Sequence, residues 1–579
     1  MTTIRAIAAA VRSGQSSAVA EVEAALARIT AYDLVQPQAW ISRFPAEDVL
    51  AIARVVDARI AAGEDLPLAG IPFAVKDNID VAGLETTAAC PAFAYWPEHN
   101  ATVVQRLCNA GAIPLGKTNL DQFATGLNGS RSPYGAPRCV FNLAYVSGGS
   151  SSGSAVAVGA GLVPLALGTD TAGSGRVPAA FNGLIGFKPS KGRWSTTGLV
   201  PACRSLDCIT AFTFDAADAA LVDGVIAGFD STDDYSRHLP DRTVGKRLGI
   251  PLPAQRPWFG DGQAEYLYDR ALQRLAELGY ELVEVDLAPL LEAAKLLYSG
   301  PWVAERTAAL EVMLRDHPQA IDPTVREIVS AGTALSAVDA FRGQYQLMHY
   351  ARMADAVWLQ VDALAVPTAP TIYRVTEMLA SPVVLNSHFG TFTNFVNLLD
   401  MAAVAVPAGY RHNGTGFGIS FLAPVGTDRA LLEMAENWGN PYPTPALDTG
   451  GFVEQIRLAV VGAHLEGMPL HWQLTSRGAM LIAATQTAPT YRLYAMAGSV
   501  PPKPALAHDA TGSAIKVEVY ELDVAAFGSF VAEVPPPLAI GTVMLADGSS
   551  VKGFVAEPRA LAGAEDITAL GGWRAYIAR

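Results

Sequence analysis

Serine is concentrated in one glycine-rich stretch of the chain, YVSGGSSSGSAVAVGAG, which begins at Tyr145 and contains five serines. A second such stretch, GTDTAGSGRVPAAFNG, begins at Gly168 and places Ser174 between two glycines. Glycine lets the backbone approach a ligand closely, and a hydroxyl group becomes a nucleophile when a base removes its proton. The two stretches therefore indicate nucleophilic catalysis. Neither has a histidine nearby, so the proton acceptor has to come from elsewhere in the chain.

The backbone before Ser174 is a candidate for binding a negatively charged oxygen. The N–H groups of Thr171, Ala172 and Gly173 are predicted to stabilise the oxyanion that develops when Ser174 attacks a carbonyl carbon. A tight turn is the alternative for a Gly/Ser loop taken alone. Asp170 and Arg176 flank the loop, and we expect them to brace it as an ion pair rather than to take part in the chemistry.

One apolar segment ends in a lysine, a side chain that can act as a base when it is buried. IPFAVK, which begins at Ile71, is predicted to be a short buried strand, and it ends at Lys76. Loss of hydration there favours the neutral amine and lowers the pKa from its reference value of about 10.4. The alternative is an ordinary ion pair between Lys76 and Asp77, or contact with solvent.

The two serine stretches together resemble the signature of the amidase signature family, in which GGSS[GS]G is followed by a small-residue helix, a glycine loop with a serine, and R-x-P-A. PLAGIPFAVKDNIDVAGLETTAA and GAIPLGKTNLDQFATG extend the resemblance, which runs from about Ala18 to about residue 440. The sequence departs from the family at Gly175, where many members carry Ile or Val, and at Ala172, which is often Gly.

The resemblance implies a Ser–Ser–Lys triad instead of a Ser–His–Asp triad. Ser174 is then the nucleophile, Ser150 the bridging serine and Lys76 the base. It also implies that a cis peptide bond precedes Ser150. A neutral lysine could then accept the proton of Ser174 through the hydroxyl of Ser150.

The order of the predicted elements indicates an α/β protein with a second, smaller part. Strands such as residues 71–76, 112–118, 162–170 and 184–190 alternate with helices such as residues 17–33 and 102–111, which favours a mixed β-sheet surrounded by helices, the amidase signature fold. NPYPTPALDTGG indicates a linker. We therefore expect an amidase domain over residues 1–440, a linker over 441–453 and a small β-rich domain over 454–579.

Two further segments resemble one branch of that family, the allophanate hydrolases. The first, LYSGPWVAERTAALE, begins at Leu297, and the resemblance implies that Tyr298 and Arg306 hold the substrate together with Gly126. Allophanate is a planar carboxylated urea, which suits the two-pronged grip of an arginine on a carboxylate. The alternative is a surface arginine beside a core tyrosine.

The second segment is the C-terminal domain, in which VVGAHLEGMPLHWQL, YRLYAMAGSVPPKPAL and GGWRAY carry the resemblance. It implies a barrel like that of the γ-glutamyl cyclotransferases and a role in breaking down N-carboxycarbamate, the product of the amidase domain, to ammonia and carbon dioxide. His464 is the candidate functional residue there, although a histidine on an apolar face is often structural. Two rival functions are a glutaminase-type or small-amide amidase, and a C-terminal domain that serves only for interaction or dimerisation.

Composition excludes several other classes. The net charge of −14 and the lack of clustered Lys and Arg argue against nucleic acid as a partner, and no apolar segment predicts a membrane span. GAIPLGKT matches the P-loop expression, but proline fills its loop, so we expect a strand and no nucleotide. We expect no metal and no organic cofactor, a cytoplasmic location, a homodimer, and a separate urea carboxylase as the functional partner.

Overall fold

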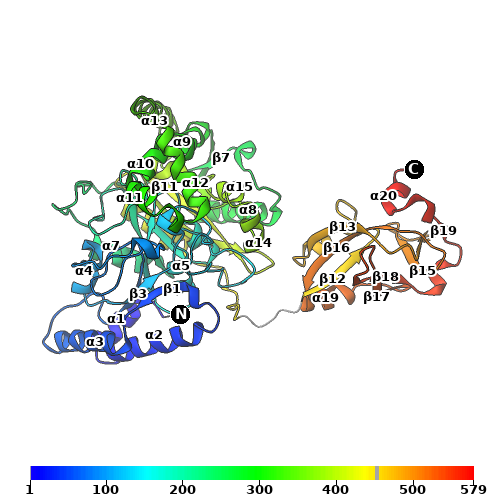
Figure 1. Cartoon of the computed structure of the whole chain (residues 1–579), viewed down its shortest axis with the longest axis horizontal. Coiled ribbons are helices and arrows are strands. Elements are labelled where there is room, and N and C mark those ends of the chain that lie inside the picture. Colours follow the sequence, from blue (N-terminus) through cyan, green and yellow to red (C-terminus); the bar gives the residue numbers. More distant parts are fainter. Residues whose placement is uncertain (1, 450–454) are drawn as a thin grey trace. The chain divides into compact units, whose positions relative to one another are not determined.

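The computed structural model describes residues 2–449 and 455–579 of the chain. It divides into two compact units, Met1–Gly450 and Gly451–Arg579 (Figure 1). Residues 441–449 contain no helix or strand, and residues 450–453 of the predicted linker lie outside the described residues. No helix of the described ranges is long and apolar enough to cross a membrane.

The first unit is built on an eleven-stranded sheet with the order β1-β3-β2-β4-β6-β5-β10-β11-β9-β7-β8. Its strands are β1 (Trp40–Arg43), β2 (Pro72–Lys76), β3 (Ile113–Thr118), β4 (Leu165–Asp170), β5 (Ile185–Lys188), β6 (Cys208–Thr213), β7 (Arg247–Pro251), β8 (Glu281–Val285), β9 (Ala363–Pro367), β10 (Met401–Tyr410) and β11 (Gly416–Pro424). β2 runs parallel to both β3 and β4, whereas β6 runs antiparallel to β4. The sheet is therefore mixed, as predicted.

Helices surround this sheet (Figure 1). They are α1 (Ile4–Arg12), α2 (Ala18–Tyr32), α3 (Ala46–Ala61), α4 (Thr102–Asn109), α5 (Ser152–Gly159), α6 (Val177–Phe181), α7 (Ala216–Ile226), α8 (Gly262–Glu277), α9 (Ala288–Ser299), α10 (Trp302–Ala309), α11 (Glu311–Asp316), α12 (Pro323–Ser330), α13 (Ala337–Trp358), α14 (Val375–Ala380), α15 (Val384–Phe389), α16 (Asn394–Leu398) and α17 (Asp428–Trp438). The α/β class and the separate β-rich part predicted from the sequence are both confirmed.

The strands that matter for the site lie in the interior of the sheet. Every residue of β2, β3, β4 and β6 is buried, which is why these segments read as continuous apolar runs rather than as alternating ones. Because β2 and β4 are parallel neighbours, their carboxyl ends meet at the same edge. Lys76, the last residue of β2, and Asp170, the last residue of β4, both lie at this edge.

Helix α5 is packed unusually tightly under this edge. All eight of its residues are buried, and its composition of Gly, Ser, Ala and Val keeps them small. A methyl group added at Gly153 would collide with the carbonyl oxygen of Ala39 and would lie 2.5 Å from the backbone nitrogen of Asn119. The loop that enters α5, which carries Ser150, is therefore held by close backbone packing.

The second unit holds a five-stranded sheet with the order β13-β16-β12-β18-β17 and a three-stranded sheet with the order β15-β14-β19. The strands are β12 (Gln455–Val460), β13 (Met480–Gln486), β14 (Tyr491–Ala495), β15 (Pro504–His508), β16 (Lys516–Asp523), β17 (Leu538–Met544), β18 (Ser550–Ala556) and β19 (Glu565–Asp566), with helices α18 (Trp472–Thr475), α19 (Val524–Val531) and α20 (Trp573–Ile577). The ends of the two outer strands, β13 and β17, are joined by backbone hydrogen bonds from Ala488 to Met544 and from Ala546 to Gln486, both 2.9 Å.

The second unit has a hydrophobic core of its own. Buried residues such as Leu458, Leu493, Val519 and Val543 form one cluster made entirely of residues from this unit. The first unit buries separate clusters around its sheet. Each unit thus has the apolar interior that independent folding needs.

We expect the first unit to fold without the second. A chain that ends at Thr449 should unfold in one cooperative thermal transition, within about 2 °C of the corresponding transition of the full chain, because it loses none of its core. Differential scanning calorimetry of both chains measures this. A shortened chain that melts without a cooperative transition would show that the two cores are not independent.

Candidate active site

Lys76 ends strand β2 with a side chain that is 0% exposed. Its Nζ lies 2.8 Å from Oγ of Ser150 and 2.7 Å from Oγ1 of Thr169, both of them hydroxyl oxygens. Burial lowers the pKa of Lys76 to about 7, although nearby carboxylates, chiefly that of Asp121, act in the opposite direction. Close to neutral pH, a large fraction of this lysine is therefore an uncharged amine.

The alternative ion pair between Lys76 and Asp77 is not formed. Asp77 instead pairs with Lys117, whose Nζ lies 3.0 Å from Oδ1 of Asp77, and both side chains are fully buried. Lys117 belongs to GAIPLGKT, which forms the interior strand β3. The prediction that this P-loop-like sequence is a strand is confirmed.

Ser150 lies in the loop that leads into α5, and the peptide bond between Gly149 and Ser150 is cis. The carbonyl oxygen of Ser150 accepts a hydrogen bond of 3.1 Å from the backbone N–H of Asp121. The next hydroxyl, that of Ser151, binds both the backbone N–H and the carbonyl oxygen of Thr169, at 3.2 and 3.1 Å. The loop is therefore fixed to the end of β4, beside Lys76.

Ser174 lies on the turn between β4 and α6 and is 2% exposed. Its neighbour Gly173 has a φ of +133°, a conformation that residues with a side chain rarely adopt. A methyl group at Gly175 would lie 2.7 Å from the side chain of Thr210. Both glycines that flank Ser174 are thus required by the geometry of the turn. Among the described residues, Ser174 makes no hydrogen bond to Ser150.

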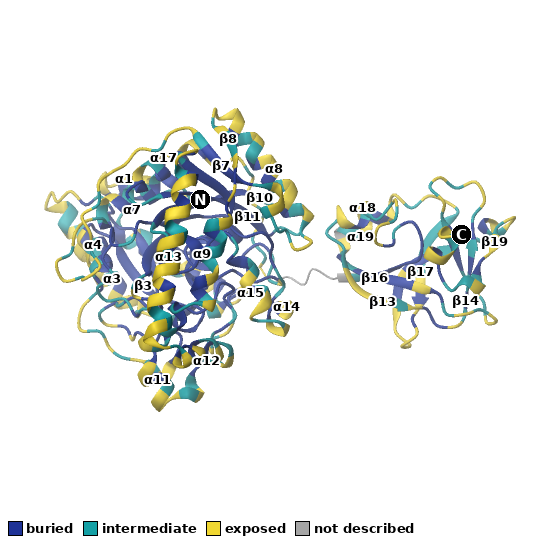
Figure 2. Cartoon of the chain, turned by 90° about the horizontal axis from the view of Figure 1, so that it is seen from above, coloured by how far each residue is buried: buried dark blue, intermediate teal, exposed yellow. Residues whose placement is uncertain are grey.

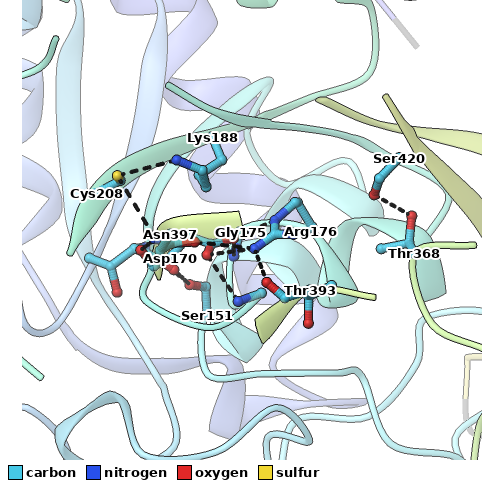
Figure 3. A network of polar contacts seen from close by, with 12 residues as sticks. Ser151, Asp170, Gly175, Arg176, Lys188, Cys208, Thr368, Thr393, Asn397 and Ser420 are labelled. Atoms are coloured by element: carbon cyan, nitrogen blue, oxygen red, sulfur yellow. Dashed lines mark hydrogen bonds and ion pairs between the residues drawn. The ribbon is translucent and has the colours of Figure 1, made fainter. Parts of the chain in front are cut away.

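Asp170 and Arg176 form the predicted ion pair under this turn, which is confirmed (Figure 3). Nε and Nη2 of Arg176 donate to the two carboxylate oxygens of Asp170 at 2.9 and 3.0 Å, and both side chains are fully buried. Although burial acts in the opposite direction, the guanidinium holds the pKa of Asp170 below its usual value. The same carboxylate accepts the backbone N–H groups of Gly173 and Gly175, at 2.9 and 3.1 Å.

These bonds correct one part of the oxyanion prediction. The N–H of Gly173 points at Asp170 and is therefore not free to bind a developing oxyanion. Within the described residues, the N–H groups of Thr171, Ala172 and Ser174 have no hydrogen-bond acceptor. These three remain the candidate donors.

Arg306 lies in the second turn of α10, and its side chain is buried. Its Nη1 donates to Oγ1 of Thr125 at 3.2 Å, next to Gly126, and its guanidinium lies 5.4 Å from the ring centre of Tyr298. The alternative of a surface arginine is wrong. Its Nε and Nη2 are buried and have no hydrogen-bond partner among the described residues. A buried guanidinium with two unused donors is suited to binding an anionic ligand.

Three side chains of this region were not predicted from the sequence. Thr169 touches Lys76, and Asp121 accepts the backbone N–H groups of Gly129 and Arg131, both at 3.0 Å. Asp207 accepts the hydroxyl of Thr171 and the N–H of Ala202, and burial raises the pKa of Asp207 to about 6. The contacts of Thr169, Asp121 and Asp207 arise from strands and loops that are far apart in the sequence but adjacent in the fold, so no local sequence pattern marks these residues.

His464, the residue predicted for the second unit, is largely enclosed by aromatic side chains. Its ring stacks on Phe554 with 5.0 Å between ring centres, and Nε2 lies 2.8 Å from Oε1 of Gln473. Burial lowers the pKa of His464, which favours the neutral ring. The histidine borders a recess of about 20 Å³ lined also by Lys503 and Leu538, which is room for a single water molecule. The described residues contain no cluster of three metal-ligating side chains.

Each of the two units matches a known protein family. Residues 20–432 match the family model "Amidase", and residues 456–578 match "Allophanate hydrolase C-terminal domain". The allophanate hydrolase of Kluyveromyces lactis, a solved structure, is 42% identical with a TM-score of 0.71, over 98% of this chain and 97% of that one.

Two curated relatives differ in length from this chain. The urea amidolyase of Lachancea kluyveri is 45% identical over 93% of this chain, but only 31% of that protein is matched, so the chain spans about a third of its length. A glutamyl-tRNA(Gln) amidotransferase subunit from Chloroflexus aggregans is 36% identical over 75% of this chain and 95% of its own. The resemblance stated from the serine loops is confirmed, and the chain belongs to the amidase family.

Proposed function

We propose that the protein hydrolyses allophanate. Ser174 attacks the terminal carbamoyl carbon, ammonia leaves, and water releases N-carboxycarbamate from the acyl-enzyme. The observation that carries this proposal is that one solved allophanate hydrolase is matched across both units and over nearly its whole length. Members of the amidase family act on many different amides, so the first unit alone does not identify the substrate. The match of the second unit to the allophanate hydrolase C-terminal domain narrows the proposal to allophanate.

The contacts of Lys76 support the proton transfers. Its neutral amine accepts the hydroxyl proton of Ser150, with which it is in hydrogen-bond contact, while Ser150 accepts the proton of Ser174 as that oxygen attacks. The protonated lysine then returns the proton through Ser150 to the departing nitrogen. In the second half of the reaction, water takes the place of Ser174. The Ser174–Ser150 hydrogen bond forms when substrate occupies the site, since such contacts often tighten only in the complex.

Two groups of donors fit the two ends of the substrate. The N–H groups of Thr171, Ala172 and Ser174 bind the oxyanion of the tetrahedral intermediate. The unused guanidinium nitrogens of Arg306 bind the carboxylate, with Tyr298 and Gly126 completing that end of the pocket. Arg306 also lies close enough to Asp207 for their charges to interact, and Asp207 holds Thr171. The carboxylate end is thereby coupled to the nucleophile turn.

For the second unit we propose a cyclotransferase-like barrel that takes N-carboxycarbamate to ammonia and carbon dioxide, with His464 in its site. The hydrogen bonds between the ends of β13 and β17 support a closed barrel. The small recess beside His464 requires side-chain movement before an organic ligand fits.

We also propose that the protein is a cytoplasmic homodimer that is functionally coupled to a urea carboxylase. Five free cysteines and no disulfide in the described residues are compatible with a reducing compartment. The relatives named urea amidolyase are about three times as long as the matched segment, which leaves room in them for a further activity. The rival function, a glutaminase-type amidase, is favoured by relatives that match the first unit alone.

Purified full-length protein should release ammonia from allophanate and much less from glutamine, malonamate or biuret. Ammonia release per allophanate consumed, measured by a coupled assay, tests this. Ser174→Ala should lower turnover at least about 10³-fold while the thermal transition is kept, because only the nucleophile is lost. Turnover of glutamine instead of allophanate would leave the triad in place and refute the substrate.

The chain that ends at Thr449 separates the two steps in the same assay. With the second unit removed, one ammonia per allophanate should appear at the rate of the full chain, and the second should follow only at the spontaneous rate. Equal kinetics for both ammonia molecules in the two chains would instead assign the second unit a role in interaction alone.

The pH profile should report Lys76. Because the neutral amine is the active form, kcat/KM should rise with pH, pass half of its maximum near pH 7 and fall about tenfold for each unit below that value. Steady-state assays from pH 5 to 9 measure the profile. Asp207→Asn is the control, because Asp207 is a second buried group whose pKa lies near this range. The variant should shift the acid limb of the profile to lower pH, since it removes a carboxylate that favours the charged form of Lys76.

If the acid limb disappears in Asp207→Asn, the limb reports the titration of Asp207 and not that of Lys76.

Arg306→Gln should reduce the preference for a carboxylated substrate. Loss of a charged donor pair should lower kcat/KM for allophanate roughly 10- to 150-fold. For biuret, which carries an amide in place of the carboxylate, the loss should be smaller. Arg315→Gln, at an arginine exposed on α11, is the matched control and should change neither value. Equal losses for allophanate and biuret would contradict the carboxylate contact.

A further inference from the structure

The GGWRAY segment, residues 571–576, connects the C-terminal end of the second unit to a loop at its beginning. Trp573 is 2% exposed and belongs to the core of the unit, whereas the side chain of Arg574 is 51% exposed. Nη2 of Arg574 donates to the carbonyl oxygen of Glu466 at 2.8 Å and to Oε1 of Glu518 at 2.7 Å. One nitrogen of this arginine therefore binds a backbone group that lies 108 residues earlier in the chain.

Glu518 binds the same residue through its other backbone group. It lies on β16, whose middle residues are buried in the second unit (Figure 2). Its Oε2 accepts the backbone N–H of Glu466 at 2.7 Å, while Oε1 accepts the guanidinium of Arg574. The N–H and the carbonyl oxygen of Glu466 are thus both bound, one by Glu518 and the other by Arg574. Such a pair of bonds fixes the backbone at this position.

The same carboxylate also reaches the far end of the loop, which runs from His464 to His471. The hydroxyl of Tyr520 donates to Oε2 of Glu518 at 3.1 Å and lies 3.0 Å from Nε2 of His471. Tyr520 is 2% exposed, so this contact is inside the unit. Glu518 therefore holds the loop at two points, directly at Glu466 and through Tyr520 at His471.

The two points lie next to His464 and next to the residue that binds its ring. His464 precedes Glu466 by two positions, and Gln473 follows His471 by two. Oε1 of Gln473 only accepts, so the Nε2 of His464 that lies 2.8 Å away carries the ring proton and Nδ1 carries the lone pair. The amide nitrogen of Gln473 donates to Glu533 at 3.3 Å, which agrees with this orientation of the amide.

We propose that Glu518 and Arg574 are positioning residues for the second step, because they hold the loop that places Nδ1 of His464. This inference rests on the proposed function of the second unit. The dianion of N-carboxycarbamate takes up two protons as it becomes ammonia and two molecules of carbon dioxide. Each C–N bond that breaks leaves its electron pair on nitrogen, which then takes a proton. A group that transfers these protons has to stand at a fixed place beside the substrate.

The exposure of Arg574 favours positioning over stability as its main contribution. An ion pair with a half-exposed partner adds little to the stability of a fold. In contrast, a displacement of about 1 Å in a reacting group can lower a rate about 100-fold. The loop touches the core through Leu465, which is 4% exposed, so the unit keeps an anchor for the loop when the ion pair is removed.

The time course of the second ammonia tests the proposal in the full-length protein, with the first ammonia as internal reference. After subtraction of the spontaneous rate, Arg574→Ala should slow the second ammonia at least about 10-fold and leave the first unchanged. Arg574→Lys should restore most of the rate, because a single nitrogen makes both contacts. Arg579→Ala is the matched control: this arginine is 57% exposed, pairs with Glu565 and should affect neither ammonia.

His464→Ala separates this proposal from the function on which it rests. A second ammonia that persists in His464→Ala would refute the role of His464 itself. Loss in His464→Ala together with an unchanged rate in Arg574→Ala would overturn the positioning role alone. The double variant should be no slower than His464→Ala, since Arg574 acts through His464, and additive losses would also overturn the proposal.

Calorimetry of each variant shows whether the second unit is still folded. If its thermal transition is lost in Arg574→Ala, Glu518→Gln takes over the test, because it keeps the shape of the side chain and removes only the charge. Glu518→Gln should slow the second ammonia and leave the first unchanged. An unchanged second ammonia in a folded Glu518→Gln protein would overturn the proposal.

Discussion

The contact between the amine of Lys76 and the hydroxyl of Ser150 is the constraint on which the site depends. A second buried lysine, Lys117, lies on the neighbouring strand and shows what the fold does otherwise: it supplies Asp77 as a counterion at 3.0 Å. Among the described residues, Lys76 has only the hydroxyl oxygens of Ser150 and Thr169 at hydrogen-bond distance, and burial lowers the pKa of its amine to about 7. Burial lowers the pKa of both lysines, but within the described residues only Lys117 has a carboxylate at hydrogen-bond distance.

The remaining parts of the site hold the two serines in place around that amine. Each serine loop is held by an aspartate residue: the backbone N–H of Asp121 donates to the carbonyl oxygen of Ser150, and the carboxylate of Asp170 accepts the N–H groups of Gly173 and Gly175. Arg176 neutralises Asp170, and this bidentate pair braces the turn without involving the hydroxyl of Ser174. The residues that carry charge under the turn are therefore distinct from those that we propose face the substrate.

Much of this arrangement was predictable from local sequence. The apolar run before Lys76 predicts a buried strand, the glycines around Ser174 predict a tight turn, and the spacing of Asp170 and Arg176 predicts their ion pair. Thr169, Asp121 and Asp207 were not predicted, because their importance comes from the parallel pairing of β2 with β4 and from loops separated by tens of residues. Gly173 was assigned to the oxyanion site because its N–H precedes the nucleophile. Sequence does not reveal that Asp170 already binds that N–H.

Helix α5 has a consequence for how substitutions in this protein are read. Every one of its side chains is buried and small, and a single methyl group at Gly153 would meet backbone atoms of two other segments. In a library of random replacements, inactive variants will therefore accumulate along residues 152–159 whether or not a position has a chemical role. Loss of function there measures steric tolerance. Only the cellular abundance of each variant distinguishes an unfolded chain from a folded one that has lost its hydroxyl.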